Sequence, residues 1–207
     1  MVFSVFQIIA SLILLTLITI LSVFSGGDLF KKGIGTLGEV SITEDLKRLR
    51  SAYYYIYNEG IVVSEHDDFV RKVMKMKLLP KYPDYNGMTY VFKKTEGVNP
   101  LIFFVLKGYD VDSDRGISED TCSKINKRFF GFGYPLKISS LKYPYLDSKE
   151  NIARLFSVAS NKSIKKDSII NVDTDSGSGV SDSSTLCFES SGLRSIYYVI
   201  NPSNLHK

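Results

Sequence analysis

Hydrophobic and charged residues are distributed so unevenly along the chain that they divide it into three parts. Residues 1–27 contain no charged side chain, and all of the Lys, Arg, Asp and Glu residues follow. This predicts a transmembrane helix over residues 1–25, because a helix over its apolar part from Val2 to Phe24 extends ~35 Å and crosses a ~30 Å hydrocarbon core. We expect a glycine-rich hinge over 26–40 and a globular head over 41–207.

Two other interpretations of the apolar segment are weaker. A buried helix of a soluble protein rarely runs this long without a charge. A cleaved secretory signal would have a shorter apolar stretch with a basic region before it. Small residues between Ser22 and Gly27 keep the signal interpretation open.

The segment after the apolar region predicts a break followed by an amphipathic helix. Five glycines fall within residues 26–38, and each costs about 1 kcal/mol in a helix interior. Ser41 and Glu44 form a capping-box pattern, which predicts a helix from near Ser41 to near Gly60. Four apolar residues then recur at helical spacing and form one stripe: Ile42, Leu46, Leu49 and Tyr53. That stripe could pack on the chain's own sheet, which is the commoner arrangement, or bind a helix of another subunit, and both can hold in a polymer.

Beyond Gly60 the pattern alternates between short helices and short strands. Helices are predicted over 64–77, after an N-cap at Ser118, and after a capping box formed by Asp147 and Glu150. Runs of β-branched and aromatic residues predict strands over the following ranges: 88–94, 101–108, 135–141, 185–190 and 193–201. The first two are expected to pair with each other, and the last two are expected to form a hairpin. A Ser-, Asp- and Gly-rich segment over 173–185 predicts an exposed loop. The head is therefore predicted to be α+β, with helices on one side of a largely antiparallel sheet.

The two cysteines, Cys122 and Cys187, bear on the compartment of the head. They have no CxxC spacing and only two histidines accompany them, so a zinc site is not favoured. Either they form one disulfide in an oxidising compartment or they are two buried free thiols. A bridge would close a loop of 187 − 122 = 65 residues and contribute about 4 kcal/mol to stability. Lys31 and Lys32, which follow the apolar segment, instead favour a cytoplasmic head by the positive-inside rule.

The candidate chemistry of the head is sparse. No nucleophile elbow, phosphate loop or dinucleotide fingerprint occurs, so neither enzymatic activity nor a small-molecule substrate is predicted. Three alternating aspartates resemble an oxygen-ligand calcium loop: Asp110, Asp112 and Asp114. Arg115 stands where an EF-hand has glycine, and Thr121 stands where it has a bidentate glutamate, so an acidic turn is the alternative. No cofactor other than calcium is suggested.

The charge of the head gives a weak indication of nucleic-acid binding. The net charge is only +4, and the best basic clusters lie at 72–77 and 124–128. Solvated helix faces explain both clusters more simply than contacts with phosphates do. Nucleic acid is therefore not an expected partner.

The order of elements resembles a known family. A long apolar segment leads into an amphipathic helix that ends in tyrosine-rich sequence and Gly60. The segment GISEDTC supplies Gly116 and Cys122 in a GxxxxxC pattern, and Cys187 precedes a terminal strand. In these features the chain resembles the type IV pilins, most closely the type IVb class that includes the toxin-coregulated pilin. The resemblance implies a pilin-like fold: a long N-terminal helix, half transmembrane and half amphipathic, packed on a mainly antiparallel sheet, with a Cys122–Cys187 disulfide near the C-terminus.

The resemblance also implies a function and a location. The chain would be a structural subunit of a pilus for adhesion, aggregation or uptake. Its partners would be other pilin subunits and the assembly machinery of the inner membrane. It would be a single-pass inner-membrane protein with a periplasmic head, and would become part of the extracellular pilus after assembly. Pilins are made with a short basic leader; if one is removed before Met1, its charge resolves the conflict over orientation.

One departure from the family suggests a minor or tip role. Family members usually carry a glutamate five residues into the mature chain, where it pairs with a neighbouring subunit's amine. Val5 occupies that place, and Gln7 is the nearest polar residue. Loss of a carboxylate that pairs in a low-dielectric filament core removes a strong docking interaction. A membrane-anchored periplasmic domain that does not polymerise, and a DNA-binding minor pilin, are the alternatives.

Overall fold

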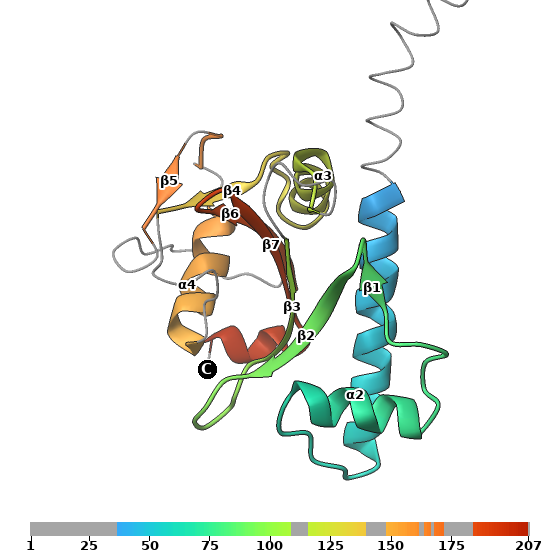
Figure 1. Ribbon diagram of the computed structural model, residues 1–207. Helices are drawn as coiled ribbons and strands as arrows, with labels where there is room; N and C mark the ends of the chain where they lie inside the picture. The colour runs from blue at the N-terminus through green and yellow to red at the C-terminus, as the bar shows by residue number, and fades with distance from the viewer. Residues whose placement is uncertain are drawn as a thin grey trace, which may run out of the picture.

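The computed structural model describes residues 37–108, 116–139, 148–161, 164–166, 168–171 and 184–206 of the 207-residue chain. Their fold is α+β, and a sheet lies between two groups of helices (Figure 1). One face carries a helix that covers residues 37–58, here called the leading helix, together with α2 (His66–Lys75) and α3 (Glu119–Phe130). The other face carries α4 (Lys149–Ala159) and the short 3-10 helix η1 (Pro202–His206).

The sheet contains seven strands in the order β1-β2-β3-β7-β6-β4-β5. Their bounds are β1 (Asp84–Tyr85), β2 (Met88–Lys94), β3 (Ile102–Lys107), β4 (Leu136–Ile138), β5 (Ile169–Ile170), β6 (Thr185–Ser190) and β7 (Leu193–Val199). The strands from β1 to β6 in this order pair antiparallel, whereas β4 is parallel to both β6 and β5. The sheet is therefore mixed, because α4 forms a crossover between β4 and β5 and such a crossover returns the chain in the same direction.

Both faces of the central strands are buried, which corrects the prediction that helices cover one side only. In β3, Phe104 and Leu106 belong to the core under the leading helix, α2 and α3. Phe103 and Val105 belong to a second core under α4 and η1. Successive side chains of a strand point to opposite faces, so a nearly continuous apolar run is typical of a strand covered on both sides.

The leading helix already covers residues 37–40, so Ser41 is not its N-cap and the predicted capping box is wrong. A Cβ atom added at Gly38 would lie 2.5 Å from the Tyr85 hydroxyl oxygen and 2.7 Å from Thr121 Oγ1. Glycine at this position lets the helix approach β1 and α3 closely. The glycine signal was taken for a break, whereas at residue 38 it serves close packing that offsets its low helix propensity.

The other predicted helices and the terminal hairpin are confirmed, with small shifts at their ends. Helix α2 is shorter than the predicted 64–77, and Ser118 caps α3 by accepting from the Thr121 N–H at 3.1 Å. Helix α4 is capped by Ser148, one residue after the predicted position, and the Ser148 side chain accepts from the Asn151 N–H at 3.2 Å. Strands β6 and β7 form the predicted hairpin, whose two turn residues both have positive φ, as a type I′ turn requires.

Several predictions fall on residues outside the described ranges. These are the transmembrane helix over 1–25 with Val5 and Gln7, the hinge over 26–36, Asp147, most of the loop over 173–185, and the aspartates Asp110, Asp112 and Asp114. Within the described part of the chain, none of the helices combines the length and the hydrophobicity needed to cross a membrane.

Candidate functional site

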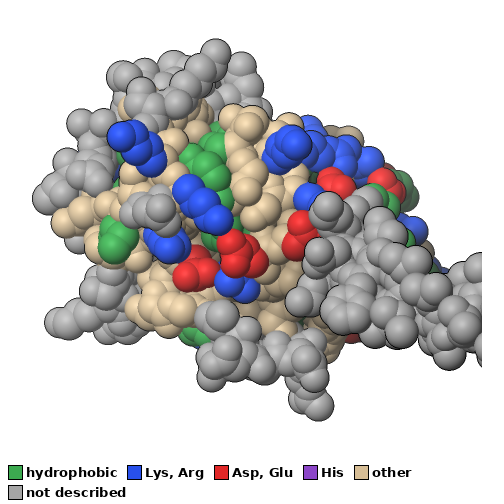
Figure 2. All heavy atoms as spheres, turned by 90° about the horizontal axis from the view of Figure 1, so that it is seen from above, with side chains coloured by type: hydrophobic (Ala, Val, Ile, Leu, Met, Phe, Trp, Pro, Cys, Tyr) green, Lys and Arg blue, Asp and Glu red, His purple; other side chains and the backbone are tan. Residues whose placement is uncertain are grey.

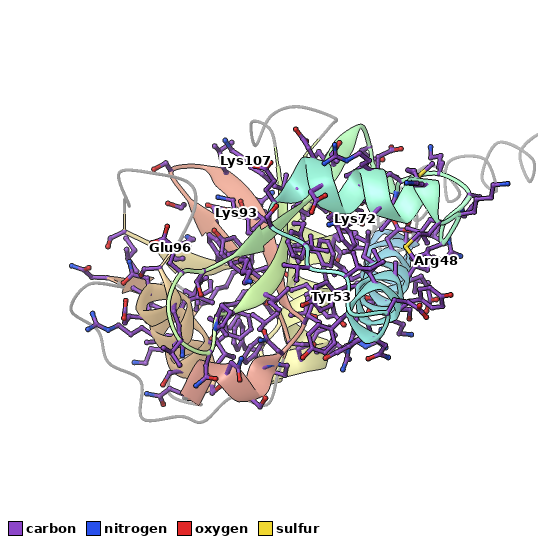
Figure 3. The ribbon with its side chains drawn as sticks, turned by 90° about the horizontal axis from the view of Figure 1, so that it is seen from below. Arg48, Tyr53, Lys72, Lys93, Glu96 and Lys107 are labelled. Atoms are coloured by element: carbon purple, nitrogen blue, oxygen red, sulfur yellow. A yellow bond between two sulfur atoms is a disulfide. The ribbon has the colours of Figure 1, made fainter. Side chains whose placement is uncertain are left out.

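The inner face of the leading helix is buried against the chain's own sheet. All four residues of the predicted stripe lie there and are at most 7 % exposed: Ile42, Leu46, Leu49 and Tyr53. The Tyr53 ring stacks on Phe92 of β2 with ring centroids 5.9 Å apart, and Figure 3 shows Tyr53 between the helix and the sheet. Of the two interpretations of the stripe, packing on the chain's own sheet is the one that the structure shows. A partner would have to contact a different face of this helix.

The outer face of the leading helix is exposed and carries apolar side chains near both ends. Leu37 is 72 % exposed, and Tyr57 at the opposite end is 63 % exposed. The basic residues Lys47, Arg48 and Arg50 lie between them, and the Arg50 guanidinium sits 5.5 Å from the Tyr54 ring centroid. Exposed apolar groups rimmed by charge are typical of surfaces that contact other proteins.

A disulfide between Cys122 of α3 and Cys187 of β6 joins a helix to the middle of the sheet. Both cysteines are fully buried, and their Cα atoms are 5.3 Å apart. The predicted pairing is therefore confirmed, and the alternative of two free thiols is wrong. The bond connects segments that are 65 residues apart in sequence.

Asn126, one helical turn after Cys122, pairs with the backbone of Cys187 as a neighbouring strand would. Its amide nitrogen donates to the Cys187 carbonyl at 2.7 Å, and its amide oxygen accepts from the Cys187 N–H at 2.9 Å. The same nitrogen donates to the Tyr134 carbonyl at 2.8 Å. Strand β4 pairs with β6 only from Phe188 onward, so this fully buried side chain satisfies a residue of β6 that β4 does not reach.

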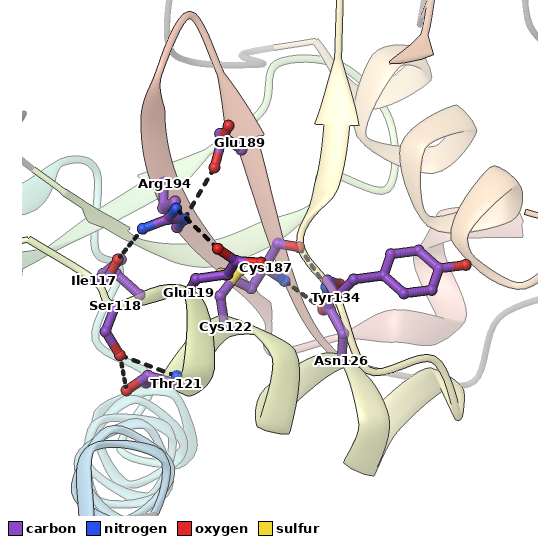
Figure 4. A network of polar contacts seen from close by, with 10 residues as sticks. All are labelled: Ile117, Ser118, Glu119, Thr121, Cys122, Asn126, Tyr134, Cys187, Glu189 and Arg194. Carbon is purple, nitrogen blue, oxygen red and sulfur yellow. Dashed lines mark hydrogen bonds and ion pairs between the residues drawn. A yellow bond between two sulfur atoms is a disulfide. The ribbon is translucent and has the colours of Figure 1, made fainter. Parts of the chain in front are cut away.

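Arg194 of β7 connects the terminal hairpin to the start of α3 (Figure 4). Its Nε donates to Glu189 Oε2 at 3.0 Å, and its Nη1 donates to the Ile117 carbonyl at 3.2 Å. Its Nη2 lies 3.9 Å from Glu119 Oε2. We call the disulfide, Asn126 and Arg194 together the disulfide junction. Every polar side chain named in it has a protein partner, so the junction is built to hold elements together.

A groove of about 840 Å³ opens at the C-terminal end of the leading helix. The last turn of the helix, the loop over 60–63, the β2–β3 connection and the residues after β7 contribute to its walls. Its lining includes the side chains of Tyr54, Tyr57, Asn58, Lys94, Asn99 and Asn204. We call this hollow the tyrosine groove; it combines aromatic rings with amide groups and one ammonium group.

The titratable groups near these surfaces are neutral or take part in structural bonds. Burial raises the pKa of Tyr53 to about 12, so its hydroxyl stays protonated at neutral pH. Burial also raises the pKa of Asp45, although that carboxylate accepts a hydrogen bond from the Tyr90 hydroxyl at 3.2 Å. Burial lowers the pKa of His66, whose Nδ1 accepts from the Phe92 N–H at 3.2 Å. His66 is thus held as a neutral cap on the edge of β2.

Each basic cluster that was considered for nucleic acid contains side chains that pair with acidic groups. Lys72 lies 2.6 Å from Asp68, and Arg128 lies 2.6 Å from Glu39 of the leading helix. Figure 2 shows basic and acidic side chains mixed on the face seen from above. Solvated, ion-paired helix faces account for these clusters. Among the described residues, no group of three or more His, Cys, Asp or Glu side chains is placed to hold a metal ion.

No protein-family model, curated protein or solved structure matches the chain.

The sequence pattern did not indicate Asn126, Arg194 or the amides of the tyrosine groove. Asn126 had one available signal, a polar residue four positions after Cys122 on the buried face of a helix. Asn99 had another signal, because asparagine directly before a proline is typical of a turn. The structure agrees, since Asn99 has a positive φ of 58°. Only the tertiary fold brings the four segments of the groove together.

Proposed function

We propose that this protein is a subunit of a type IVb-like pilus in a minor or tip position. Its apolar segment over 1–25 would hold it in the inner membrane, with the head in the periplasm before assembly. The observation that carries the proposal is the arrangement of the leading helix, whose inner face packs on the sheet while its outer face is exposed. This arrangement agrees with the fold that the sequence resemblance implies.

The disulfide supports the orientation in this proposal. Structural disulfides persist in oxidising compartments such as the periplasm and are rare in the cytosol. The Cys122–Cys187 bond is fully buried and lies beside fully satisfied hydrogen bonds, as a structural disulfide does. A periplasmic head agrees with this, against the orientation that Lys31 and Lys32 alone favour.

The outer face of the leading helix is the part of the head that we assign to contact with neighbouring subunits. It carries the exposed residues Leu37 and Val40 in the first described turn of this helix. Transfer of an apolar helix from lipid to a helical filament core gains little, because both surroundings are apolar. Assembly would therefore need an energy-driven machine in the membrane, and side-chain packing would select the partners.

The lack of an acidic side chain in the apolar segment, where the resemblance implies one, supports the minor or tip position. A subunit without the acidic group cannot neutralise a neighbour's terminal amine in the filament core, and Gln7 offers hydrogen bonds only. Such a subunit suits the end of a filament, where one of the repeating contacts is not needed. We therefore expect few copies per filament.

Filaments sheared from cells that produce the native protein test this proposal. Quantitative mass spectrometry should find the chain in the filament fraction at a small fraction of the abundance of the repeating subunit. A processed and methylated N-terminal residue in the same sample would establish pilin-type handling. Recovery only from membranes, with an unprocessed N-terminus, would instead identify a tethered domain that does not polymerise.

A matched pair of variants tests the assigned surface. Leu37→Glu places a charge on the outer face of the leading helix and should lower recovery in filaments at unchanged membrane abundance. Val98→Glu places the same charge at an even more exposed site, 88 % exposed, in the loop between β2 and β3. That variant should assemble normally, and equal loss in both variants would contradict the assignment.

A further inference from the structure

We propose that the tyrosine groove binds a short neutral saccharide. The inference concerns the head alone and does not depend on whether the chain enters a filament. It goes beyond assembly because the groove opens to solvent at the C-terminal end of the leading helix, at the opposite end from Leu37 and Val40.

The first observation is a rigid aromatic surface. Tyr57 is 63 % exposed, and its ring stacks on Tyr53 at a centroid distance of 6.1 Å and an interplanar angle of 21°. Tyr53 stacks in turn on the buried Phe92 at 5.9 Å and 25°. One face of Tyr57 is therefore backed by a column of rings that leads into the core. The electron-rich face of such a ring attracts the slightly positive C–H groups on the flat side of a pyranose.

A second aromatic ring is fixed beside the first. The Tyr54 ring lies edge-on to Tyr53 at 5.8 Å and 69°. Its hydroxyl donates to the Ile200 carbonyl at 3.2 Å, which ties the ring to the residues after β7. Two tyrosines in fixed positions present contact area without the entropy cost of ordering them on binding.

The second observation is a set of unused amide groups around these rings. Within the described part of the chain, the side chains of Asn58 and Asn99 make no hydrogen bond. Asn204 donates from Nδ2 to the Pro100 carbonyl at 3.2 Å, and its amide oxygen accepts no hydrogen bond from a described residue. An amide offers both donors and an acceptor, and so matches sugar hydroxyls, which also do both.

Asn201, in contrast, uses its side-chain amide to hold the wall of the tyrosine groove together. Its oxygen accepts from the Ile102 N–H at 2.9 Å, and its nitrogen donates to the Pro100 carbonyl at 2.9 Å. Both ends of this amide hold the chain after β7 against the start of β3. The groove thus has fixed polar groups in its wall and free polar groups at its surface.

Charge and polarity argue for a neutral saccharide over other ligands. Lys94 is the one charged side chain among the described residues that line the groove. A single exposed ammonium group is a weak site for a multiply charged phosphate, which usually needs several donors. An apolar peptide would bury the amides without partners, at a cost for each group. A volume of about 840 Å³ has room for a ligand of several rings.

Saturation-transfer NMR tests the proposal on the full chain, purified in a detergent without a sugar headgroup. The probes are lactose, maltotriose and triacetylchitotriose, each titrated to ~10 mM, a range that detects weak complexes. At least one should show saturable transfer. Tyr57→Ala should lower its affinity about tenfold, and Asn58→Ala about fivefold, through loss of the ring contact and of one hydrogen bond.

Tyr55→Ala is the matched control, because Tyr55 is 50 % exposed on the same turn of the helix but does not line the groove. Its affinity should equal that of the unaltered chain. Near-ultraviolet circular dichroism checks that each variant keeps its fold. The proposal is overturned if none of the three saccharides gives saturable transfer, or if Tyr55→Ala and Tyr57→Ala lower binding equally. Neither result would change the expected recovery of the chain in filaments.

Discussion

The disulfide junction and the tyrosine groove are both rich in polar groups, yet they use them in opposite ways. At the junction, the side chains of Asn126 and Arg194 form hydrogen bonds with the chain's own backbone and with a carboxylate. At the groove, the side chains of Asn58 and Asn99 make no hydrogen bond within the described residues. Buried polar groups need partners inside the protein, whereas groups at a solvent-filled surface can exchange water for a ligand. The same residue type therefore indicates stability in one place and recognition in the other.

Removal of the disulfide should have the largest effect on stability. In the Cys122→Ala and Cys187→Ala double variant the unfolded chain regains the freedom of a 65-residue loop, which corresponds to about 4 kcal/mol in the free energy of unfolding. Denaturant unfolding of the full chain in detergent, followed by near-ultraviolet circular dichroism, measures this. An unchanged midpoint would mean that the junction holds without the covalent bond.

Asn126→Ala should have the next largest effect. It leaves both backbone groups of Cys187 and the Tyr134 carbonyl without their side-chain partner. Each unsatisfied buried group costs about 1–3 kcal/mol, and partial relaxation should bring the total to about 3 kcal/mol. The same unfolding assay applies, with the disulfide kept intact under non-reducing conditions. A loss below about 0.5 kcal/mol would show that the backbone of β6 finds other partners.

The sequence predicted the elements better than their arrangement. Periodicity located the helices, the two hairpins and the cap at Ser118, because burial on one face imposes a repeat that local sequence records. It did not foresee that β4 runs parallel to β6, nor that helices cover both faces, although the run LIFFVL in residues 101–106 was a usable signal of burial on both sides. These features depend on which elements meet in space.

In the candidate sites, too, the sequence predicted some features, whereas others depend on the tertiary fold. The pairing of Cys122 with Cys187 followed from cysteine count and family resemblance, and the stripe that includes Ile42 followed from helical spacing. The role of Gly38 depends on Tyr85 and Thr121, which lie far away in sequence, so local propensity pointed to a break instead. The groove amides come from separate loops, where no repeat constrains the sequence.

Gly38→Ala should destabilise the protein by about 1 kcal/mol. Alanine favours a helix over glycine by about 1 kcal/mol, but the new methyl group would lie 2.5 Å from the Tyr85 hydroxyl oxygen and 2.7 Å from Thr121 Oγ1. Overpacking of this kind costs about 1–3 kcal/mol and should exceed the gain. In a Tyr85→Phe background one of the two clashes is absent, so the alanine should cost less there. An alanine that stabilises both backgrounds equally would show that the contact with α3 is loose.

Substitutions of the groove amides should have the smallest effect, and they test the contrast with the junction directly. Asn58→Ala removes a side chain without a described partner and should change the free energy of unfolding by less than about 0.5 kcal/mol. Asn99→Gly should do the same, because glycine adopts the positive φ of 58° without strain. Both are measured beside Asn126→Ala in the denaturant assay. If Asn58→Ala lowered the free energy of unfolding as much as Asn126→Ala does, the groove amides would be structural groups. Their side chains would then stabilise the fold as Asn126 does and would not be free to bind a ligand.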